Sequence, residues 1–282
     1  MTTLIEEIDF HGTPALRLIG PRGASATVSR LGGQALSWIT PDGREHLFLS
    51  EKAVFDGSQA IRGGVPVCFP QFAGLGALPK HGLLRTRCWE PASRRCGDDY
   101  VLVTLATEAE GETRAHWPHD FRAEITVMLE TDRLDIELCV TNTGTTPLVF
   151  TAALHTYLRL IQVEDAALEG LYGCAFRDAA RGNAMRRDCG TELVIEDETD
   201  RVYHDVPRPL LLKAGNLSLG IHSQGFPDVV VWNPWETRCA ALADMTPTAW
   251  RQMLCVEAAA ARQPVTVAAG AEWAGRQTLV VV

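Results

Sequence analysis

The chain has 282 residues, of which 46% are hydrophobic and 22% charged, and this balance is typical of a globular protein and excludes a disordered or fibrous one. Its 35 acidic and 26 basic residues leave a formal net charge of −9, so a nucleic acid is not expected as a partner. The longest apolar runs fall far short of the roughly 20 residues that a membrane helix needs, so no membrane span is predicted.

The predicted elements are almost all short strands. Two-residue alternation of apolar and polar side chains, turn residues and β-branched content predict strands, in chain order, at Leu16–Ile19, Ala26–Ser29, Tyr100–Thr107, Ala123–Glu130, Leu134–Thr141, Val149–Leu158, Leu210–Lys213, Leu217–His222, Val229–Trp232, Met253–Glu257, Pro264–Ala268 and Glu272–Val282. Short helices are predicted only at Thr237–Met245 and Thr248–Gln252. Without an internal repeat or a long linker, the pattern predicts an all-β protein, a large antiparallel sandwich, with residues 1–282 in one domain.

The N-terminus and the cysteines indicate the compartment. The opening residues MTTLIEE carry acids where a secretory signal has basic residues and then an apolar core, so the mature protein is expected in the cytoplasm. Eight cysteines are spread over the chain without a C-x-x-C pair, and they are expected to be reduced thiols that serve mostly as small core or edge residues.

The glycine-rich segment from Ala60 to Gly76 is not a nucleotide site. It lacks the spacing of a phosphate-binding loop, and Pro66 and Pro70 prevent the helix that would follow one. What remains is Arg62 beside two glycines in a proline-stiffened loop, which is also compatible with a structural loop carrying a surface arginine.

Three cations, Arg62, Lys80 and Arg85, suggest an anion pocket on an otherwise acidic protein. Arginine offers a planar fork to phosphate and lysine a point charge, so a small phosphorylated ligand is plausible. The alternative is that these are unrelated surface cations.

Two ionisable residues interrupt apolar strands. His155 lies within FTAALHTYL, and Glu257 ends QMLCVE. Unpaired acids are rarely buried, so this carboxyl group needs a partner, a proton or a function. On separate inner strands the two residues would suit general acid–base chemistry, whereas a lone histidine on such a strand is more often a satisfied core residue.

Two other polar positions have side chains that could bind a ligand. Asp228 precedes a buried strand that leads to Trp232 and Trp235, an arrangement common in carbohydrate sites, although a capping aspartate explains it as well. His116 and His119 are separated by a proline-containing turn with no third ligand at typical spacing, so no metal site is predicted.

Taken together, several motifs resemble the glucose-6-phosphate 1-epimerases, the phosphosugar branch of the aldose 1-epimerase (galactose mutarotase-like) superfamily. From about Leu31 to the C-terminus, and in the expected order, they are IRGGVPVCFP from Ile61, HGLLR from His81, WPH from Trp117, LHTY from Leu154, DVVVWNP from Asp228 and CVE from Cys255. The resemblance implies a β-supersandwich that binds its sugar on a concave face and uses no metal or organic cofactor.

The resemblance also implies roles for individual residues. His155 is similar to the acid that protonates the ring oxygen, and Glu257 to the base that takes the proton of the anomeric hydroxyl. His81 matches the histidine that steadies the ring, Asp228 the acid that binds hydroxyls, and Arg62 and Arg85 the arginines that recognise phosphate. Lys80 stands where many relatives have glutamine, and Leu83-Leu84 replaces an aromatic–small pair. Lys80 is included among the expected substrate-binding residues.

Three functions therefore remain open at the level of the sequence. The favoured one is an isomerase, expected to be a monomer, that interconverts the anomers of a hexose 6-phosphate. An aldose 1-epimerase acting on unphosphorylated sugars would share His155 and Glu257 but would not need the three cations. A noncatalytic carbohydrate-binding sandwich would need neither the acid nor the base.

Overall fold

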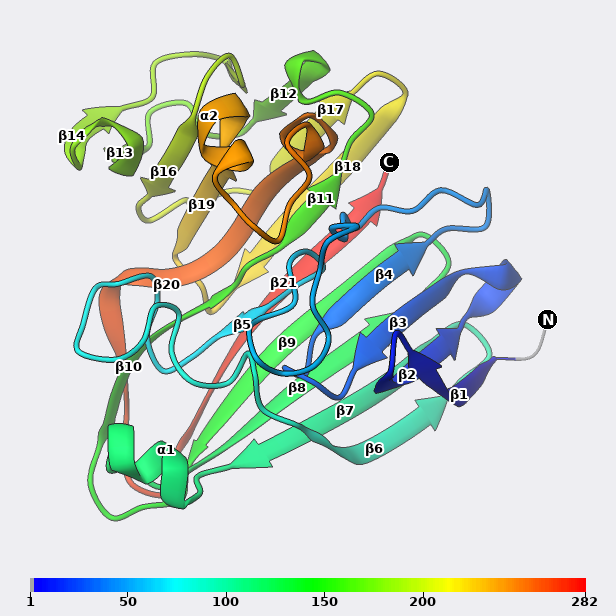
Figure 1. Cartoon of the computed structure of the whole chain (residues 1–282), viewed down its shortest axis with the longest axis vertical. Coiled ribbons are helices and arrows are strands. Elements are labelled where there is room, and N and C mark those ends of the chain that lie inside the picture. Colours follow the sequence, from blue (N-terminus) through cyan, green and yellow to red (C-terminus); the bar gives the residue numbers. More distant parts are fainter. Residues whose placement is uncertain (1–2) are drawn as a thin grey trace.

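The computed structural model describes residues 3–282, and within them the chain forms three sheets in which all paired strands are antiparallel (Figure 1). The first sheet has the order β1-β2-β3-β4, formed by β1 (Leu4–Phe10), β2 (Thr13–Ile19), β3 (Ser25–Ser29) and β4 (Ala35–Ile39). No helix in residues 3–282 is both long enough and apolar enough to span a membrane.

The two larger sheets carry the remaining strands. The eight-stranded sheet has the order β14-β13-β16-β19-β20-β10-β5, and β11 also pairs with β20; its strands are β5 (Val67–Cys68), β10 (Leu148–Leu154), β11 (Tyr157–Arg159), β13 (Ala175–Asp178), β14 (Ala184–Arg187), β16 (Thr199–Tyr203), β19 (Asp228–Asn233) and β20 (Met253–Val267). The nine-stranded sheet has the order β15-β12-β17-β18-β21-β9-β8-β7-β6, with β6 (Glu90–Cys96), β7 (Val101–Glu108), β8 (Phe121–Leu129), β9 (Arg133–Asn142), β12 (Ala166–Glu169), β15 (Glu192–Val194), β17 (Leu210–Ala214), β18 (Leu217–Gln224) and β21 (Glu272–Val281).

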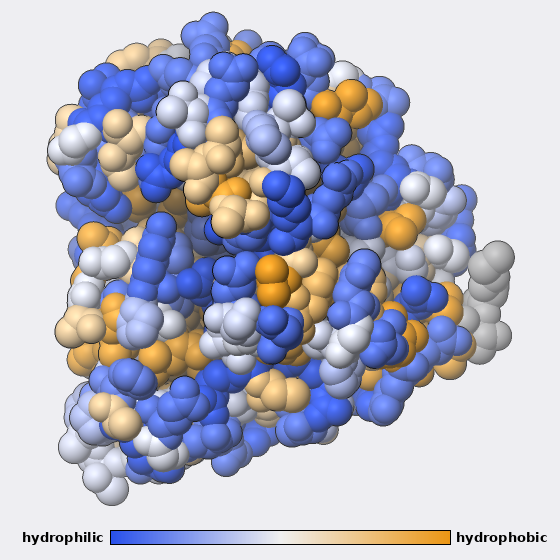
Figure 2. All heavy atoms as spheres, in the orientation of Figure 1, coloured by the Kyte–Doolittle hydropathy of each residue, from blue (hydrophilic) through white to orange (hydrophobic). Residues whose placement is uncertain are grey.

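Helical structure is confined to short segments. The α-helices are α1 (Gly111–His116) and α2 (Trp235–Ala240), and 3₁₀ segments occur at Pro21–Gly23, Val163–Asp165, Ala179–Arg181 and Ala249–Gln252. Figure 2 shows the face viewed in Figure 1, on which hydrophilic side chains predominate and hydrophobic ones form smaller separate patches.

The two larger sheets pack face to face around one main core. Along β8 every second residue is buried, as expected for a strand with one face inward. Ile125 of β8 and Val256 of β20 belong to the same buried cluster, so the core lies between the sheets. Gln277 of β21 joins them further, because its side chain donates to the Val256 carbonyl oxygen at 2.9 Å and accepts from the Thr156 hydroxyl.

Strand β20 is buried on both faces. Residues Met253 to Ala261 are all buried, and Ala259 and Ala261 belong to a second, smaller apolar cluster on the face turned away from the main core. The segment between β4 and β6, cyan in Figure 1, lies beside β10 and β20, and it supplies Cys68 of β5 and the loop residue Phe72 to that cluster. This second face of β20 is therefore buried too, and the loops that cover it can bring polar groups against it.

The structure confirms the predicted all-β antiparallel sandwich with few short helices and corrects several elements. The helix predicted at Thr237–Met245 spans Trp235–Ala240 instead, and the one at Thr248–Gln252 is a 3₁₀ segment. The strand predicted at Val149–Leu158 is interrupted between β10 and β11. There the backbone amides of His155 and Tyr157 donate to the carbonyl oxygens of Pro66 and Gly64, in the loop before β5. Helix α1 was not predicted.

Gly64 allows the loop that follows β4 to pack closely against the backbone of β4. Its φ is +60°, and a Cβ added there would collide with the Ala35 carbonyl oxygen, whereas Gly43 has a φ of +83° and open space around it. We expect Gly64→Ala to lower the free energy of unfolding by clearly more than Gly43→Ala, for which the left-handed conformation alone costs about 1–2 kcal/mol. Urea denaturation of both variants tests this, and equal losses would contradict a special role for Gly64.

Candidate active site

Strand register brings polar residues from four strands into one row. Asp200 pairs with Trp232, Trp232 with Cys255, and Tyr157 with Cys255. Opposed residues of antiparallel strands project to the same face, so these side chains share the face of the eight-stranded sheet turned away from the main core. Glu257 lies two residues beyond Cys255 on that face, opposite Val230.

A cleft of about 280 Å³ lies over this row. Its walls include six of the seven predicted site residues, which are Arg62, Lys80, His81, Arg85, His155 and Glu257. Five lysine or arginine side chains but only two carboxyl groups line it, although the whole chain is acidic. The cleft is therefore a local concentration of positive charge.

His155 and Glu257 form a buried pair at the bottom of the cleft. Their Nε2 and Oε1 atoms are 3.4 Å apart. The backbone break at His155 lets its amide donate to the Pro66 carbonyl oxygen at 2.9 Å, and the ring stacks on Tyr157 with centroids 4.9 Å apart. Among residues 3–282, Nδ1 of His155 and Oε2 of Glu257 have no hydrogen-bond partner although both are buried. The pair is thus fixed in position and has unused bonding capacity.

Burial keeps both members of the pair uncharged in the empty cleft. The pKa of Glu257 is raised well above its ordinary value, mainly by desolvation and further by Asp200. The pKa of His155 is lowered well below its ordinary value, again mainly by desolvation and then by His81 and the positive charges of Arg85 and Arg62. Desolvation therefore favours the uncharged form of each group, the neutral imidazole and the protonated carboxyl.

His81 is held as a neutral hydrogen-bond donor. Burial, and then Arg85, lower its pKa to about 3. Its Nδ1 lies 3.2 Å from the Cys68 sulfur and accepts from the Ala73 amide at 3.4 Å. The hydrogen of the neutral ring therefore belongs on Nε2. His81 also has a φ of +66°, an uncommon conformation for a residue with a side chain.

The predicted cations differ in how firmly they are held. Nε of Arg62 pairs with Asp244 at 3.0 Å, and its Nη1 donates to the Tyr157 hydroxyl at 2.9 Å. Arg85 donates from Nη2 to the carbonyl oxygen of Lys80 at 2.7 Å, while the Lys80 side chain is exposed at the rim. Arg62 is thus preset, whereas Arg85 and Lys80 keep donors for a ligand.

Asp228 does not line the cleft. It is fully buried, and its Oδ2 accepts from the backbone amides of Ala261 and Arg262 at 2.9 and 2.8 Å. These bonds hold the irregular part of β20, where its pairing with β10 shifts register. These contacts are those of a structural residue, as in the capping alternative, and the sugar-binding role expected for Asp228 stays a prediction.

Asp200 takes the place in the cleft that was expected for Asp228. It is half-buried, lines the cleft, and has a pKa raised mainly by desolvation and lowered in part by Arg238. Sequence reasoning missed it because it ends the acidic run EDETD, which resembles a solvated loop. The available signal was the two-residue spacing of Asp200 and Val202, which is typical of one face of a strand and falls within β16.

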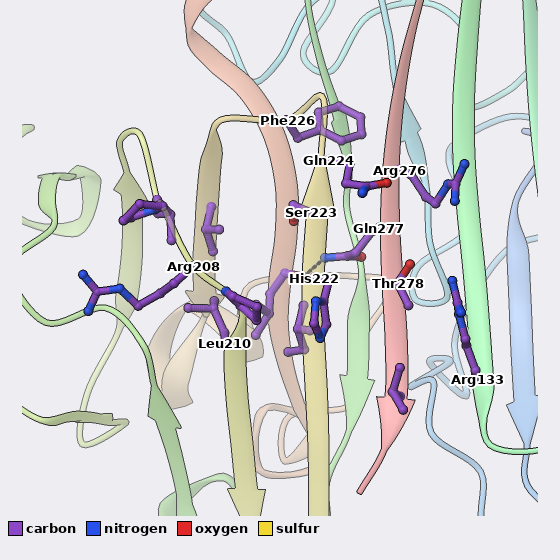
Figure 3. A pocket seen from close by; sticks show the side chains of 17 residues that line it. Arg133, Arg208, Leu210, His222, Ser223, Gln224, Phe226, Arg276, Gln277 and Thr278 are labelled. Carbon is purple, nitrogen blue, oxygen red and sulfur yellow. Dashed lines mark hydrogen bonds between the residues drawn. The ribbon is translucent and has the colours of Figure 1, made fainter.

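A larger hollow, of about 450 Å³, lies elsewhere in the molecule (Figure 3). It is bounded by β18, β21 and the segment 206–210, and none of the seven predicted residues lines it. Two of its arginines are already paired, Arg133 with Asp135 at 2.9 Å and Arg276 with Glu137 at 2.7 Å. The smaller cleft, which holds the acid–base pair, is therefore the candidate active site.

The two roles considered for Asp228 predict different defects. In Asp228→Asn an NH2 group replaces one carboxylate oxygen and must face either the Asp205 amide or the amides of Ala261 and Arg262, to which it cannot act as acceptor, so we expect the free energy of unfolding to fall by about 1–3 kcal/mol. The KM of the folded variant should remain near that of the wild type. Denaturant unfolding and steady-state kinetics would measure both, and a raised KM with unchanged stability would restore the sugar-binding role.

Comparisons with known proteins show the family of the chain. The family described as aldose 1-epimerase matches residues 14–279. A protein of Cenchrus ciliaris is 33% identical, with 96% of this chain and 85% of that protein covered, and one of Escherichia coli K12 is 31% identical, with 84% and 80% covered; both are named "putative glucose-6-phosphate 1-epimerase". The crystal structure of a "putative mutarotase" from Salmonella typhimurium has a TM-score of 0.92 at 25% identity, covering 99% of this chain and 94% of that one. The chain belongs to the aldose 1-epimerase family.

Proposed function

We propose that the protein interconverts the α and β anomers of a hexose 6-phosphate, with glucose 6-phosphate, named for its relatives, as the substrate. The observation that carries the proposal is the buried His155–Glu257 pair beside a cleft rich in cations. An acid and a base in contact suit this reaction, because the ring oxygen and the anomeric hydroxyl that they must reach are attached to the same carbon.

The reaction needs only proton transfers. As the bond between C1 and the ring oxygen breaks, His155 gives a proton to the ring oxygen and Glu257 takes the proton of the anomeric hydroxyl, which leaves an aldehyde. After the aldehyde turns about its bond to C2, the two groups return the protons in the opposite sense and the ring closes on the other face. One shared proton therefore serves both directions, and no other reactant is consumed.

These roles require the shared proton to lie on His155 when the sugar is bound. In the empty cleft desolvation favours the neutral pair, with the proton on Glu257. The sugar brings hydroxyl groups that hydrogen-bond the charged forms, and this lowers the cost of placing charge on the pair. Substrate binding is thus proposed to favour transfer of the proton from Glu257 to His155.

The remaining residues of the cleft are proposed to hold the substrate. Arg85 and Lys80 offer free donors to the phosphate, and the preset Arg62 adds positive charge beside them. His81 would donate from Nε2 to a sugar oxygen, and Asp200 would accept hydroxyl hydrogens in place of Asp228. We further propose that the enzyme works as a cytoplasmic monomer.

Anomer exchange of phosphorylated and free sugar tests the substrate. We expect two-dimensional exchange NMR at neutral pH to show faster exchange for glucose 6-phosphate than for glucose. In Arg85→Gln, the advantage of the phosphorylated sugar should shrink by about tenfold or more, since a charged hydrogen bond contributes about 1.5–3 kcal/mol. Arg44→Gln, outside the cleft, is the matched control. Equal rates on both sugars would favour the enzyme of unphosphorylated sugars.

Substitutions in the proposed catalytic pair should reduce turnover rather than binding. Each positioned acid or base contributes about 10²–10⁴-fold, so we expect His155→Ala and Glu257→Gln to lower kcat by that factor with a small change in KM. Saturation kinetics of anomer exchange measure the two constants separately. Wild-type turnover in either folded variant would refute the assignment, and sugar binding without turnover in the unmodified protein would favour the noncatalytic sandwich.

A further inference from the structure

Cys255 lies beside the proposed catalytic pair, but the proposed reaction does not use it. Its side chain is fully buried, on the same face of β20 as Glu257 and opposite Tyr157. Donor atoms of His155, Cys255 and Glu257 all lie within 4.8 Å of one another. A nitrogen, a sulfur and an oxygen donor thus lie close together, of which His155 and Glu257 line the cleft and Cys255 is buried beside it.

We infer that His155, Cys255 and Glu257 form a binding site for a thiophilic divalent cation such as Zn²⁺, and that its occupation excludes the sugar. The inhibition rests on the proposed function, whereas the metal site rests on the three donors alone. Zn²⁺ commonly takes three protein ligands from cysteine, histidine and carboxylate and leaves a fourth position open. Mg²⁺ and Ca²⁺ prefer sets made of oxygen, so they are not expected here.

One pair of donors already has the spacing of a tetrahedral site, and all three donors lie within 4.8 Å of one another. With metal–ligand distances of about 2.0–2.3 Å, two ligands of a tetrahedral Zn²⁺ lie about 3.3–3.6 Å apart. His155 Nε2 and Glu257 Oε1 already have this separation, at 3.4 Å. The buried Oε2 of Glu257 and Nδ1 of His155 have no partners among residues 3–282, so binding breaks no hydrogen bond of theirs.

Metal binding and sugar binding would use the same groups. Coordination replaces the thiol hydrogen and the carboxyl hydrogen, which leave as two protons to the solvent, and the imidazole binds through a ring lone pair. No oxidation or reduction is involved. His155 and Glu257 line the cleft, so the fourth metal position, filled by water, opens where the sugar would bind. The cation therefore removes both proposed catalytic groups at once.

Cobalt can report the site directly. We expect Co²⁺ added to the wild-type protein to give a thiolate-to-cobalt absorption band in the near ultraviolet together with the visible bands of a tetrahedral ion. Both should be lost in Cys255→Ser and retained in Cys174→Ser, which removes another buried thiol outside the cleft. Unchanged spectra in Cys255→Ser, or no thiolate band in the wild type, would overturn the proposed site.

Inhibition by Zn²⁺ provides the second measurement. Loss of even an outer-shell partner typically costs 10–100-fold in metal affinity, so removing the thiolate ligand should raise the half-inhibiting Zn²⁺ concentration by about 100-fold or more while anomer exchange continues. Cys174→Ser should be inhibited like the wild type, and equal inhibition of both variants would contradict the site. If Cys255→Ser fails to fold, loss of the cobalt bands in Glu257→Gln is the required result, and their persistence refutes the site. Cobalt bands without anomer exchange would overturn the proposed function and leave the metal site standing.

Discussion

A carboxyl group removed almost completely from water is the constraint on which the site depends. Glu257 is 1% exposed and lies in the middle of a strand with neighbours on both sides. An isolated carboxylate there would be very costly, so the group must hold a proton or face a partner that can exchange one. His155 is that partner, and its own burial keeps it neutral. Burial therefore favours the uncharged form of each member of the pair.

The sheet and the loops each contribute different residues to the surroundings of this pair. Strands β16, β19, β20 and β11 form the row that runs from Asp200 to Tyr157. Their register determines which residues belong to it, because a shift of one residue would turn a strand's side chains to the other face. The loops between β4 and β6 bring Arg62, His81 and Arg85 over that row. A rigid base with functional groups on loops is a common arrangement in proteins. Here it places the positive charge beside the row that contains Asp200 and Tyr157.

The fold and much of the site followed from local sequence patterns, but some long-range features did not. Two-residue alternation located β7, β8 and β9 well, since each has one buried and one more exposed face. It did not predict the break at His155, which depends on hydrogen bonds to Pro66 and Gly64, far away in the sequence. Motif order identified His155 and Glu257 as candidates, and their roles remain predictions.

Asp200 and Asp228 show the limit most clearly. Both are single aspartates on strands that face the cleft side of the sheet, and only the covering segments decide which one the solvent reaches. At Asp228 the chain folds over the carboxylate and uses it as an acceptor for Ala261 and Arg262. At Asp200 the chain leaves it open. Neighbouring residues in the sequence carry no information about that difference.

Gln277 ties the completion of the site to the order in which the ribosome makes the chain. Its side chain bonds to Thr156, next to His155, and to Val256, next to Glu257, so it braces both halves of the pair from the opposite sheet. β21 must therefore emerge before the pair is held on both sides. Likewise β10 gains its neighbour β20 only after residues 253–267 have been made, and a nascent chain with apolar strand edges is prone to aggregation. Such a protein should depend on chaperones late in its synthesis, when most of its residues have already been made.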